Sequence, residues 1–415
     1  MIRRIMVAVG LCALLGATTL GGPASASAGA SKHVRLVLPH LAGARRACAA
    51  PTSPGMAACM AIVGTTAGGR PDVSPSVPQG YGPTQFHTAY NLPTTAGTPQ
   101  TIAIIDAYSQ PAIYSDLATY DSTYGLPVFP TCLSDSDTGC FLVLNQDGGT
   151  SSLPPSDTGW GIEISMDVEV AHAICQDCRI ELYEANSSSF GNLAHAVNTA
   201  VSRGADVVSN SYGDDGKTTS DCAASVPTGA YNHPGVAITV SAGDDGFGRS
   251  CPAVLNTVIA VGGTTLHLDP DTSAYVSESV WNGTGAGCSQ AHPARSFQKA
   301  LGSWKHIGCP GRGMNDLAAD ADPNTGAAVY DSDYGGWLPV GGTSLSAPLI
   351  GAAYALAHNA STWTYPSRSV YDTRSGFRDV VAGGDGPCPV PVRCKATGGY
   401  DLPTGVGSPN GLTGL

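Results

Sequence analysis

The sequence predicts an α/β protein with a mostly parallel central sheet and helices on both faces. Short apolar runs typical of strands alternate with segments of helical character along most of the chain. This alternation is typical of parallel sheets that are covered on both sides. The chain has 415 residues, of which 42% are hydrophobic, and this is enough to bury one large core or two modest ones. Ligands of such sheets bind beyond the carboxyl ends of the strands.

The expected elements follow from apolar runs and helical periodicity. The first strand is expected at 101–106 (TIAIID) and is followed by a polar helix at 111–124. Further expected helices are 160–174 and 192–202, and further expected strands are 179–184, 206–209, 236–242 and 258–261. A last apolar run, 337–340, is followed by two glycines and then by an expected helix rich in small residues.

The N-terminal region predicts export from the cell. Arg3 and Arg4 precede an apolar run at 5–15, and the small residues that follow offer cleavage near Ala26 or Ala28. Residues 1–28 are therefore predicted to be a secretory signal peptide. Residues 29–79, rich in Ala, Pro and Gly, are expected to form a short pro-segment or linker with little core. A compact domain is expected from residue 80 to residue 415.

The net charge and the hydropathy of the chain argue against two classes of partner, nucleic acid and membrane. The formal net charge is −12, which argues against nucleic acid as a partner. Beyond the N-terminus there is no apolar run of about 18 residues, the length that a membrane anchor requires. A secreted, extracellular monomer is expected.

The cysteines fit an oxidising compartment. Outside the signal peptide there are twelve, an even number, and they fall into near neighbours. Six local disulfides are predicted: Cys48–Cys59, Cys132–Cys140, Cys175–Cys178, Cys222–Cys251, Cys288–Cys309 and Cys388–Cys394. The alternative is a zinc site that includes His172, Cys175 and Cys178, although no second ligand pair at suitable spacing accompanies them.

The stretch 341–353 (GGTSLSAPLIGAA) holds a candidate nucleophile. A strand, a glycine turn and a helix would place the Ser344 hydroxyl at a helix N-terminus, where free N–H groups favour developing negative charge. The alternative is that Ser344 only caps the helix.

Three carboxylates elsewhere could serve such a serine. Glu163 and Asp167 are four residues apart on one helix and project from the same face, whereas Glu169 falls on another face. The rest of this helix is mostly apolar, so a solvent-facing role for the two acids fits poorly. Asp244 follows an apolar strand, where chemistry occurs in this architecture, but Asp245 is its neighbour and position alone does not separate the two.

Three motifs together resemble the sedolisin family of serine-carboxyl peptidases, which have a subtilisin-like three-layer fold. They are 163–174 (EISMDVEVAHAI), 241–246 (SAGDDG) and 341–348 (GGTSLSAP), and they occur in the family's order. The resemblance spans about residue 80 to the C-terminus and makes 80–415 a peptidase domain. It implies that Ser344 is the nucleophile, Glu163 its general base, Asp167 the carboxylate that orients Glu163, and Asp244 the acid of the oxyanion hole.

The resemblance predicts a secreted endopeptidase of protein or peptide substrates that acts at acidic pH. The chemistry points the same way, because a carboxylate serves as base near its pKa and an aspartic acid donates to an oxyanion only while protonated. A subtilisin-type triad could use Asp106 and Ser344, but Glu163 stands where its histidine would be. A catalytically silent secreted binding or surface protein that keeps the fold is the second hypothesis.

The C-terminal motifs 377–380 (FRDV), 398–401 (GGYD) and 403–409 (PTGVGSP) resemble the family's calcium site. The resemblance implies one structural Ca²⁺, whose ligands would be Asp379, Val380, Thr397, Gly399 and Asp401. Carboxylates and backbone carbonyls are ligands that calcium prefers. The alternative is two ordinary loop aspartates. Tyr212 stands where some members have Trp at the substrate cleft and is a candidate substrate-binding residue.

Overall fold

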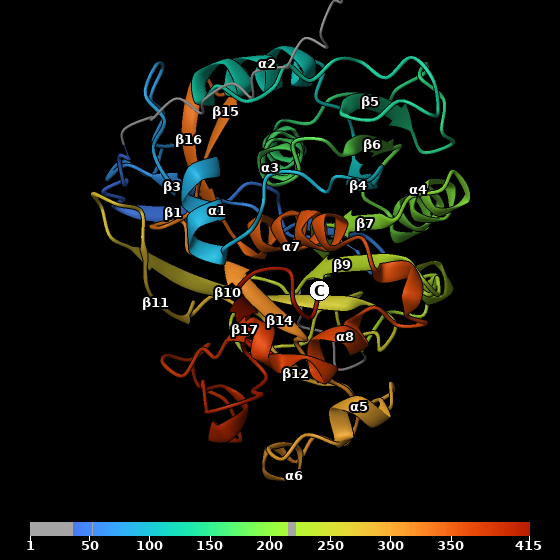
Figure 1. The fold of residues 1–415 in the computed structure, drawn as a ribbon, viewed down its shortest axis with the longest axis vertical. Coiled ribbons are helices and arrows are strands. Elements are labelled where there is room, and N and C mark those ends of the chain that lie inside the picture. Colours follow the sequence, from blue (N-terminus) through green and yellow to red (C-terminus); the bar gives the residue numbers. More distant parts are fainter. Residues whose placement is uncertain (1–35, 52, 215–220) are drawn as a thin grey trace, which may run out of the picture.

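A computed structural model describes residues 36–51, 53–214 and 221–415 of the chain (Figure 1). Its largest sheet has eight strands, in the order β11-β10-β9-β7-β4-β6-β5, with β14 also paired to β10. These strands are β4 (Thr101–Ala107), β5 (Cys140–Asn145), β6 (Arg179–Ala185), β7 (Val207–Asn210), β9 (Ala237–Ser241), β10 (Ile259–Leu268), β11 (Tyr275–Val280) and β14 (Leu317–Asp320). Every pair is parallel except β10 with β11. The predicted signal peptide lies outside the described residues.

Helices cover both faces of this sheet, as the sequence predicts. On one face α3 (Thr158–Ile174) and α7 (Thr343–Ala357) pack against each other, and a Cβ on Gly351 of α7 would touch the side chains of Val207, Ser209 and Thr239. Strand register then puts Asp106 and Glu184 on this same face. The opposite face is covered by α4 (Phe190–Ser202). The α/β prediction is confirmed.

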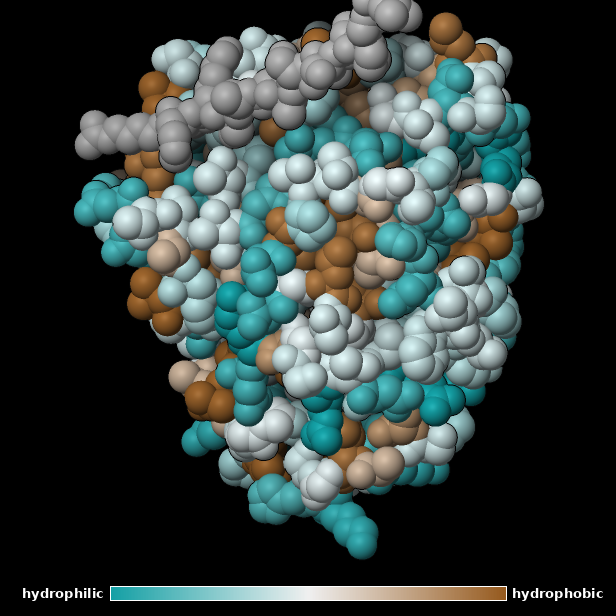
Figure 2. Space-filling view, viewed as in Figure 1, coloured by the Kyte–Doolittle hydropathy of each residue, from teal (hydrophilic) through white to brown (hydrophobic). Residues whose placement is uncertain are grey.

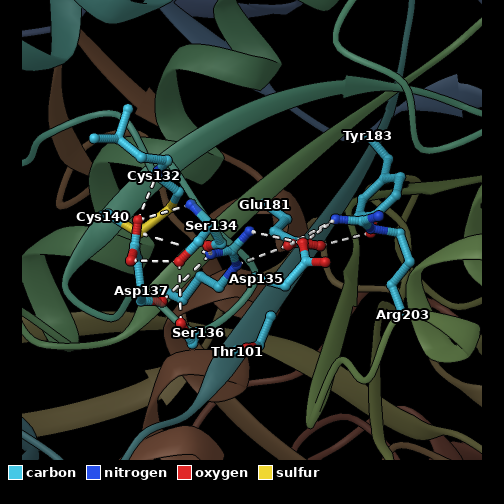
Figure 3. Close-up of polar contacts among 12 residues, drawn as sticks. Thr101, Cys132, Ser134, Asp135, Ser136, Asp137, Cys140, Glu181, Tyr183 and Arg203 are labelled. Carbon is cyan, nitrogen blue, oxygen red and sulfur yellow. Dashed lines mark hydrogen bonds and ion pairs between the residues drawn. A yellow bond between two sulfur atoms is a disulfide. The ribbon is translucent and has the colours of Figure 1, made fainter.

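The face that α4 covers holds its charges in ion pairs (Figure 3). Glu181 of β6 accepts hydrogen bonds from Arg179 Nε at 2.7 Å and from the Tyr183 hydroxyl at 2.6 Å. Arg203, at the end of α4, lies 3.8 Å from Glu181 and 3.0 Å from Asp135. The buried Glu181 carboxylate therefore has both cations and a hydroxyl donor beside it.

Helix caps account for the small differences from the expected boundaries. α3 begins two residues earlier than expected because the Asp157 carboxylate accepts from the amides of Gly159 and Trp160. α4 likewise begins at Phe190 because the Ser189 hydroxyl accepts from the Asn192 amide. Strand β10 continues beyond residue 261, since its second half pairs with β11.

The segment before residue 80 differs from expectation. The sequence predicted little core there, yet residues 57–63 are buried. β3 (Ile62–Thr65) forms a second sheet with β1 (Gly43–Arg46), β16 (Gly336–Gly341) and β15 (Ala327–Asp331), and β2 (Ala58–Cys59) pairs with β8 (Tyr212–Gly213). The composition of the segment did not predict this burial, because strands from elsewhere in the chain cover its backbone and its own side chains do not.

The remaining elements lie around these sheets. They are α1 (Pro83–Tyr90), α2 (Ile113–Tyr124), β12 (Gly287–Cys288), α5 (Ser296–Lys299), α6 (Trp304–Ile307), β13 (Gly313–Met314), α8 (Ser367–Asp372), β17 (Phe377–Arg378), β18 (Ser408–Pro409) and four short 3-10 turns. Among the described residues, no helix has the length and apolar character needed to cross a membrane. The face seen in Figure 2 mixes polar and apolar residues.

All six predicted disulfides are confirmed. The Cys175–Cys178 bond occupies both sulfurs of the alternative zinc site. His172 instead stacks on Phe129 and lies 3.3 Å from Asp121. The zinc hypothesis is therefore wrong for these residues.

Candidate active site

Ser344 lies where strand β16 turns into helix α7. Gly342 makes the turn with a φ of 92°, a conformation that favours glycine, and Ser344 is in the first turn of the helix. The Ser344 hydroxyl donates to the Ser211 carbonyl oxygen at 3.1 Å. The predicted strand-to-helix corner is therefore present.

Glu163 and Asp167 project from α3 toward Ser344. The side chain of Glu163 interacts with Ser344 and with Asp167, and Asp167 also interacts with the Ser211 hydroxyl. In the carboxylate form neither acid has a proton to donate, and the Ser344 hydroxyl donates its hydrogen bond to the Ser211 carbonyl oxygen. The carboxylate oxygens of both acids therefore have no hydrogen-bond donor among the described residues. A proton shared between the two acids would satisfy both.

Burial controls the protonation of this pair. Both side chains are fully buried. Burial raises the pKa of Asp167 to about 8, against the lowering effect of the neighbouring Ser211 and Glu163 side chains. Burial also raises the pKa of Glu163 well above its usual range, and the nearby charges of Asp167 and Asp106 raise it further. The pair thus keeps at least one proton in acidic solution.

Asp244 lies beside the start of α7. Its Oδ1 accepts hydrogen bonds from the Thr343 amide and hydroxyl, both at 2.8 Å, while its Oδ2 has no partner among the described residues. Burial raises the pKa of Asp244 to about 6, although Arg46 and the Thr343 hydrogen bonds act against the rise. Asp245 instead points outward to an ion pair with Arg46 at 3.0 Å. The structure thus distinguishes two neighbours that the sequence left equivalent.

Two further carboxylates extend the cluster. Asp106 is the next-to-last residue of β4, and Glu184 lies opposite it in β6. Burial, then the charges of Asp167 and Glu184, raise the pKa of Asp106 well above its usual range. Burial raises the pKa of Glu184 to about 7, against the hydrogen bonds from Ser109 and the Gln110 amide. Sequence reasoning considered Asp106 only for a histidine triad and missed Glu184; the alignment of two strand ends was the available signal.

Glu169 and Tyr212 lie apart from this constellation. Glu169 faces β15, where its Oε2 accepts from the Tyr330 amide at 3.0 Å. The Tyr212 side chain is buried, and its hydroxyl donates to Asn210 and contacts the Tyr231 hydroxyl. The backbone of Tyr212, however, pairs with Cys59 of β2.

Two of the predicted calcium ligands, Asp379 and Asp401, lie near each other in the C-terminal loops. The Gly399 amide donates to Asp379 and the Thr397 amide to Asp401, which brings the two aspartates together. Burial raises the pKa of Asp401 to about 7, and the Asp379 charge adds to the rise. Both oxygens of buried Asp385, whose pKa burial and the Asp401 charge raise to about 8, have no partner among the described residues. A hard cation with oxygen ligands fits this negative cluster.

The fold and the serine–carboxylate site define a class of protein. A family model for the subtilase family matches residues 166–377, which is about half of the chain. The chain belongs to this family, and its α/β fold is subtilisin-like.

Individual relatives narrow the similarity within the family. The chain is 30% identical to sedolisin of Pseudomonas sp. (strain 101) over 80% of its own length, and 28% identical to kumamolisin of Bacillus sp. (strain MN-32) over 81%. It spans 60% and 63% of the lengths of those two proteins. The solved structure of Pseudomonas sedolisin, a serine-carboxyl proteinase complexed with pseudo-iodotyrostatin, matches with a TM-score of 0.63 and 28% identity over 81% of this chain and 96% of that one. The predicted resemblance to the sedolisin family is confirmed.

Proposed function

We propose that this protein is a secreted serine-carboxyl endopeptidase that hydrolyses peptide bonds at acidic pH. The observation that carries the proposal is the contact of Glu163 with both Ser344 and Asp167 inside a buried site without a histidine partner for Ser344 among the described residues. A serine needs a base within reach, and that base needs a third group to orient it.

Glu163 takes the Ser344 proton as the hydroxyl attacks the substrate carbonyl, and later gives it to the leaving amine. Asp167 orients Glu163 and shares the proton of the pair with it, and transfer of that proton to Asp167 leaves Glu163 charged as the base that the reaction needs. The high pKa of both acids makes Glu163 a stronger base than an exposed glutamate, which suits proton transfer from a hydroxyl.

Asp244 stabilises the oxyanion. Its Oδ2 has no partner among the described residues and lies beside Gly342, at the start of the helix that carries Ser344. The acid can donate a hydrogen bond to the oxyanion only when protonated, and its pKa of about 6 therefore sets an upper pH limit for the reaction. The acidic range follows from this requirement.

Hydrolysis of a denatured protein from pH 3 to 8, with wild type and the Ser344→Ala variant, tests the proposal. Activity below about pH 6 that the variant lacks is the expected result. A maximum at pH 8 would contradict a carboxylate base, and no activity at any pH after acid treatment would favour the silent binding protein. Internal fragments identify an endopeptidase, whereas release of short terminal peptides alone identifies an exopeptidase.

We also propose one structural Ca²⁺ in the C-terminal loops. Asp379 and Asp401 would hold it with the backbone carbonyls of Val380, Thr397 and Gly399. The ion would neutralise buried carboxylates in loops that carry none of the proposed catalytic residues, so its proposed contribution is to stability.

A further inference from the structure

A cavity lies between helix α2 and the loop that follows it, and we call it the α2 cavity. Its lining includes Tyr114, Leu117, Asp121, Leu126, Val128 and Phe129. None of the candidate catalytic residues lines it, and in Figure 1 α2 runs along the top of the molecule whereas α7 crosses its middle. Its volume is about 250 Å³, below the range of about 300–1,000 Å³ that is typical of pockets for drug-sized ligands. The α2 cavity is therefore separate from the site described above and suits a small ligand.

The walls of the α2 cavity are mostly apolar. Leu117 is buried, whereas Val128 is 88% exposed and Tyr114 is 40% exposed. Phe129 stacks on His172 of α3, with the two ring centroids 3.9 Å apart. Ligand sites are typically lined by hydrophobic and aromatic side chains together with a few polar groups. The cavity therefore offers a partly aromatic surface to the apolar part of a ligand.

The α2 cavity has one carboxylate in its lining, that of Asp121. The Asp121 side chain is only 7% exposed, and its Oδ1 accepts no hydrogen bond from the described residues. His172 Nε2 lies 3.3 Å from this oxygen, but neither ring nitrogen of His172 forms a hydrogen bond within the described part of the chain. A buried carboxylate without a donor costs free energy. A ligand that donates a hydrogen bond to Asp121 would remove this cost.

The charges around Asp121 favour a cation as that donor. The described residues that line the cavity include no basic side chain. Behind the cavity, the buried carboxylates of Glu169 and Asp116 lie near enough to Asp121 for the charges of the other two to act on Glu169. These carboxylates would repel an anion. An ammonium group would instead form a charge-assisted hydrogen bond with Asp121, which is stronger than a bond between neutral groups.

The backbone beside the α2 cavity argues for a small molecule rather than a peptide. One wall is helix α2, whose interior backbone groups bond within the helix. On the loop side, the Leu126 amide donates to the Asp121 carbonyl oxygen at 3.0 Å. Extended peptides are commonly bound by backbone hydrogen bonds to an open strand edge. These walls present side chains instead.

We propose that the α2 cavity binds a small primary amine with an aromatic body, whose ammonium group donates to the Asp121 carboxylate. The aromatic body lies against Leu117, Val128 and Phe129 and displaces water from these apolar side chains. Binding does not depend on the proposed peptidase activity, because no candidate catalytic residue takes part in it.

Titration calorimetry of the full chain with phenethylamine at pH 7 tests this proposal. The expected Kd is about 1 mM or lower, a value that ligands of this size reach when most of their atoms are buried. Phenylethanol, which has a similar shape without the charge, should bind at least about tenfold more weakly. Phenylpropionate, an anion, should not bind. No binding of the amine, or binding of the alcohol or the anion as tight as that of the amine, would overturn the inference.

Two substitutions test where the amine binds. Asp121→Asn keeps the shape of the side chain and should weaken amine binding at least about tenfold, with little change for phenylethanol. Ala118→Trp, at an exposed helical residue that lines the cavity, should fill it and abolish binding of both compounds. Asp147→Asn, at a side chain that is 70% exposed, is the control for net charge and should leave both affinities unchanged. Melting temperatures verify that each variant folds. Amine binding that survives both cavity substitutions would contradict the proposal.

Discussion

The two faces of strand β6 carry buried glutamates in opposite electrostatic settings. Glu181 faces α4 and is hydrogen-bonded by Arg179 and the Tyr183 hydroxyl. Glu184, three residues later, faces α3 and lies beside Asp106 in a cluster with Asp167 and Glu163, where no cation is paired with it among the described residues. The two glutamates lie on opposite faces of the sheet because side chains alternate between the faces along a strand. The paired carboxylate supports the fold, whereas the unpaired cluster holds protons that chemistry can use.

The largest expected effect is on activity, at the unpaired cluster. Glu163→Gln removes the proposed base and should lower kcat by about 10²–10⁴-fold at pH 4, the usual worth of general-base catalysis. Glu169→Gln, on another face of the same helix, is the matched control and should keep activity close to wild type. Steady-state rates on a protein substrate, with circular dichroism to verify folding, measure both. Equal losses in the two variants would show that helix α3 acts only structurally.

Asp244 should show the next largest effect. Asp244→Asn should lower kcat by about 10²–10³-fold, the loss typical of one oxyanion donor. Because an amide donates at any pH, the fall in activity near pH 6 should also disappear. Asp245→Asn, at a residue that forms an exposed ion pair with Arg46, should lower kcat less than tenfold. This variant should also retain the fall in activity near pH 6. The pH profiles of kcat for the two variants make the comparison.

Stability should respond in opposite ways on the two faces. Glu181→Gln leaves the Arg179 guanidinium buried with less compensation and should cost on the order of 3 kcal/mol. For Glu184, folding raises the pKa to about 7, so its stabilising contribution is complete below the pKa of the unfolded chain and is lost as pH rises through 7.

Glu184→Gln should therefore raise the melting temperature at pH 8 relative to wild type and change it little at pH 4. Asp167, with its pKa of about 8, acts in the same direction, so wild type itself should melt several degrees lower at pH 8 than at pH 5. Melting curves from pH 4 to 8 test both expectations. Greater stability of wild type at pH 8 would contradict the raised pKa values.

The smallest effect is expected at the second unpaired cluster, where the proposed Ca²⁺ would take the place of protons. Chelation of calcium at pH 7 should lower the melting temperature by a few degrees, since a ligand bound only to the folded state stabilises it. Asp379→Asn should remove this response, and Asp372→Asn, in an exposed pair with Arg368, should keep it. No change on chelation would count against a bound ion.

The local sequence pattern predicted the main helices and strands, together with the part of the candidate site that lies on one helix. The strand 101–106 and the helices that became α3 and α7 follow from apolar periodicity and caps, and the Glu163–Asp167 spacing follows from helix geometry. The six disulfides follow from sequence neighbours, because short loops close at little entropic cost. These features need only residues close in sequence.

Tertiary structure decided the rest, because strand pairing joins residues that are far apart in sequence. The choice of Asp244 over Asp245 depended on contact with Thr343, about a hundred residues later. Asp106 and Glu184 lie in the carboxylate cluster with Asp167 because of the register in which β4 pairs with β6. The sequence by itself determined a serine at a helix start with acids to serve it. Only the folded chain showed that residues 57–63 are buried, with β2 paired to β8 and β3 to β16, since backbone hydrogen bonds hold them there and the side-chain pattern carries no record of those bonds.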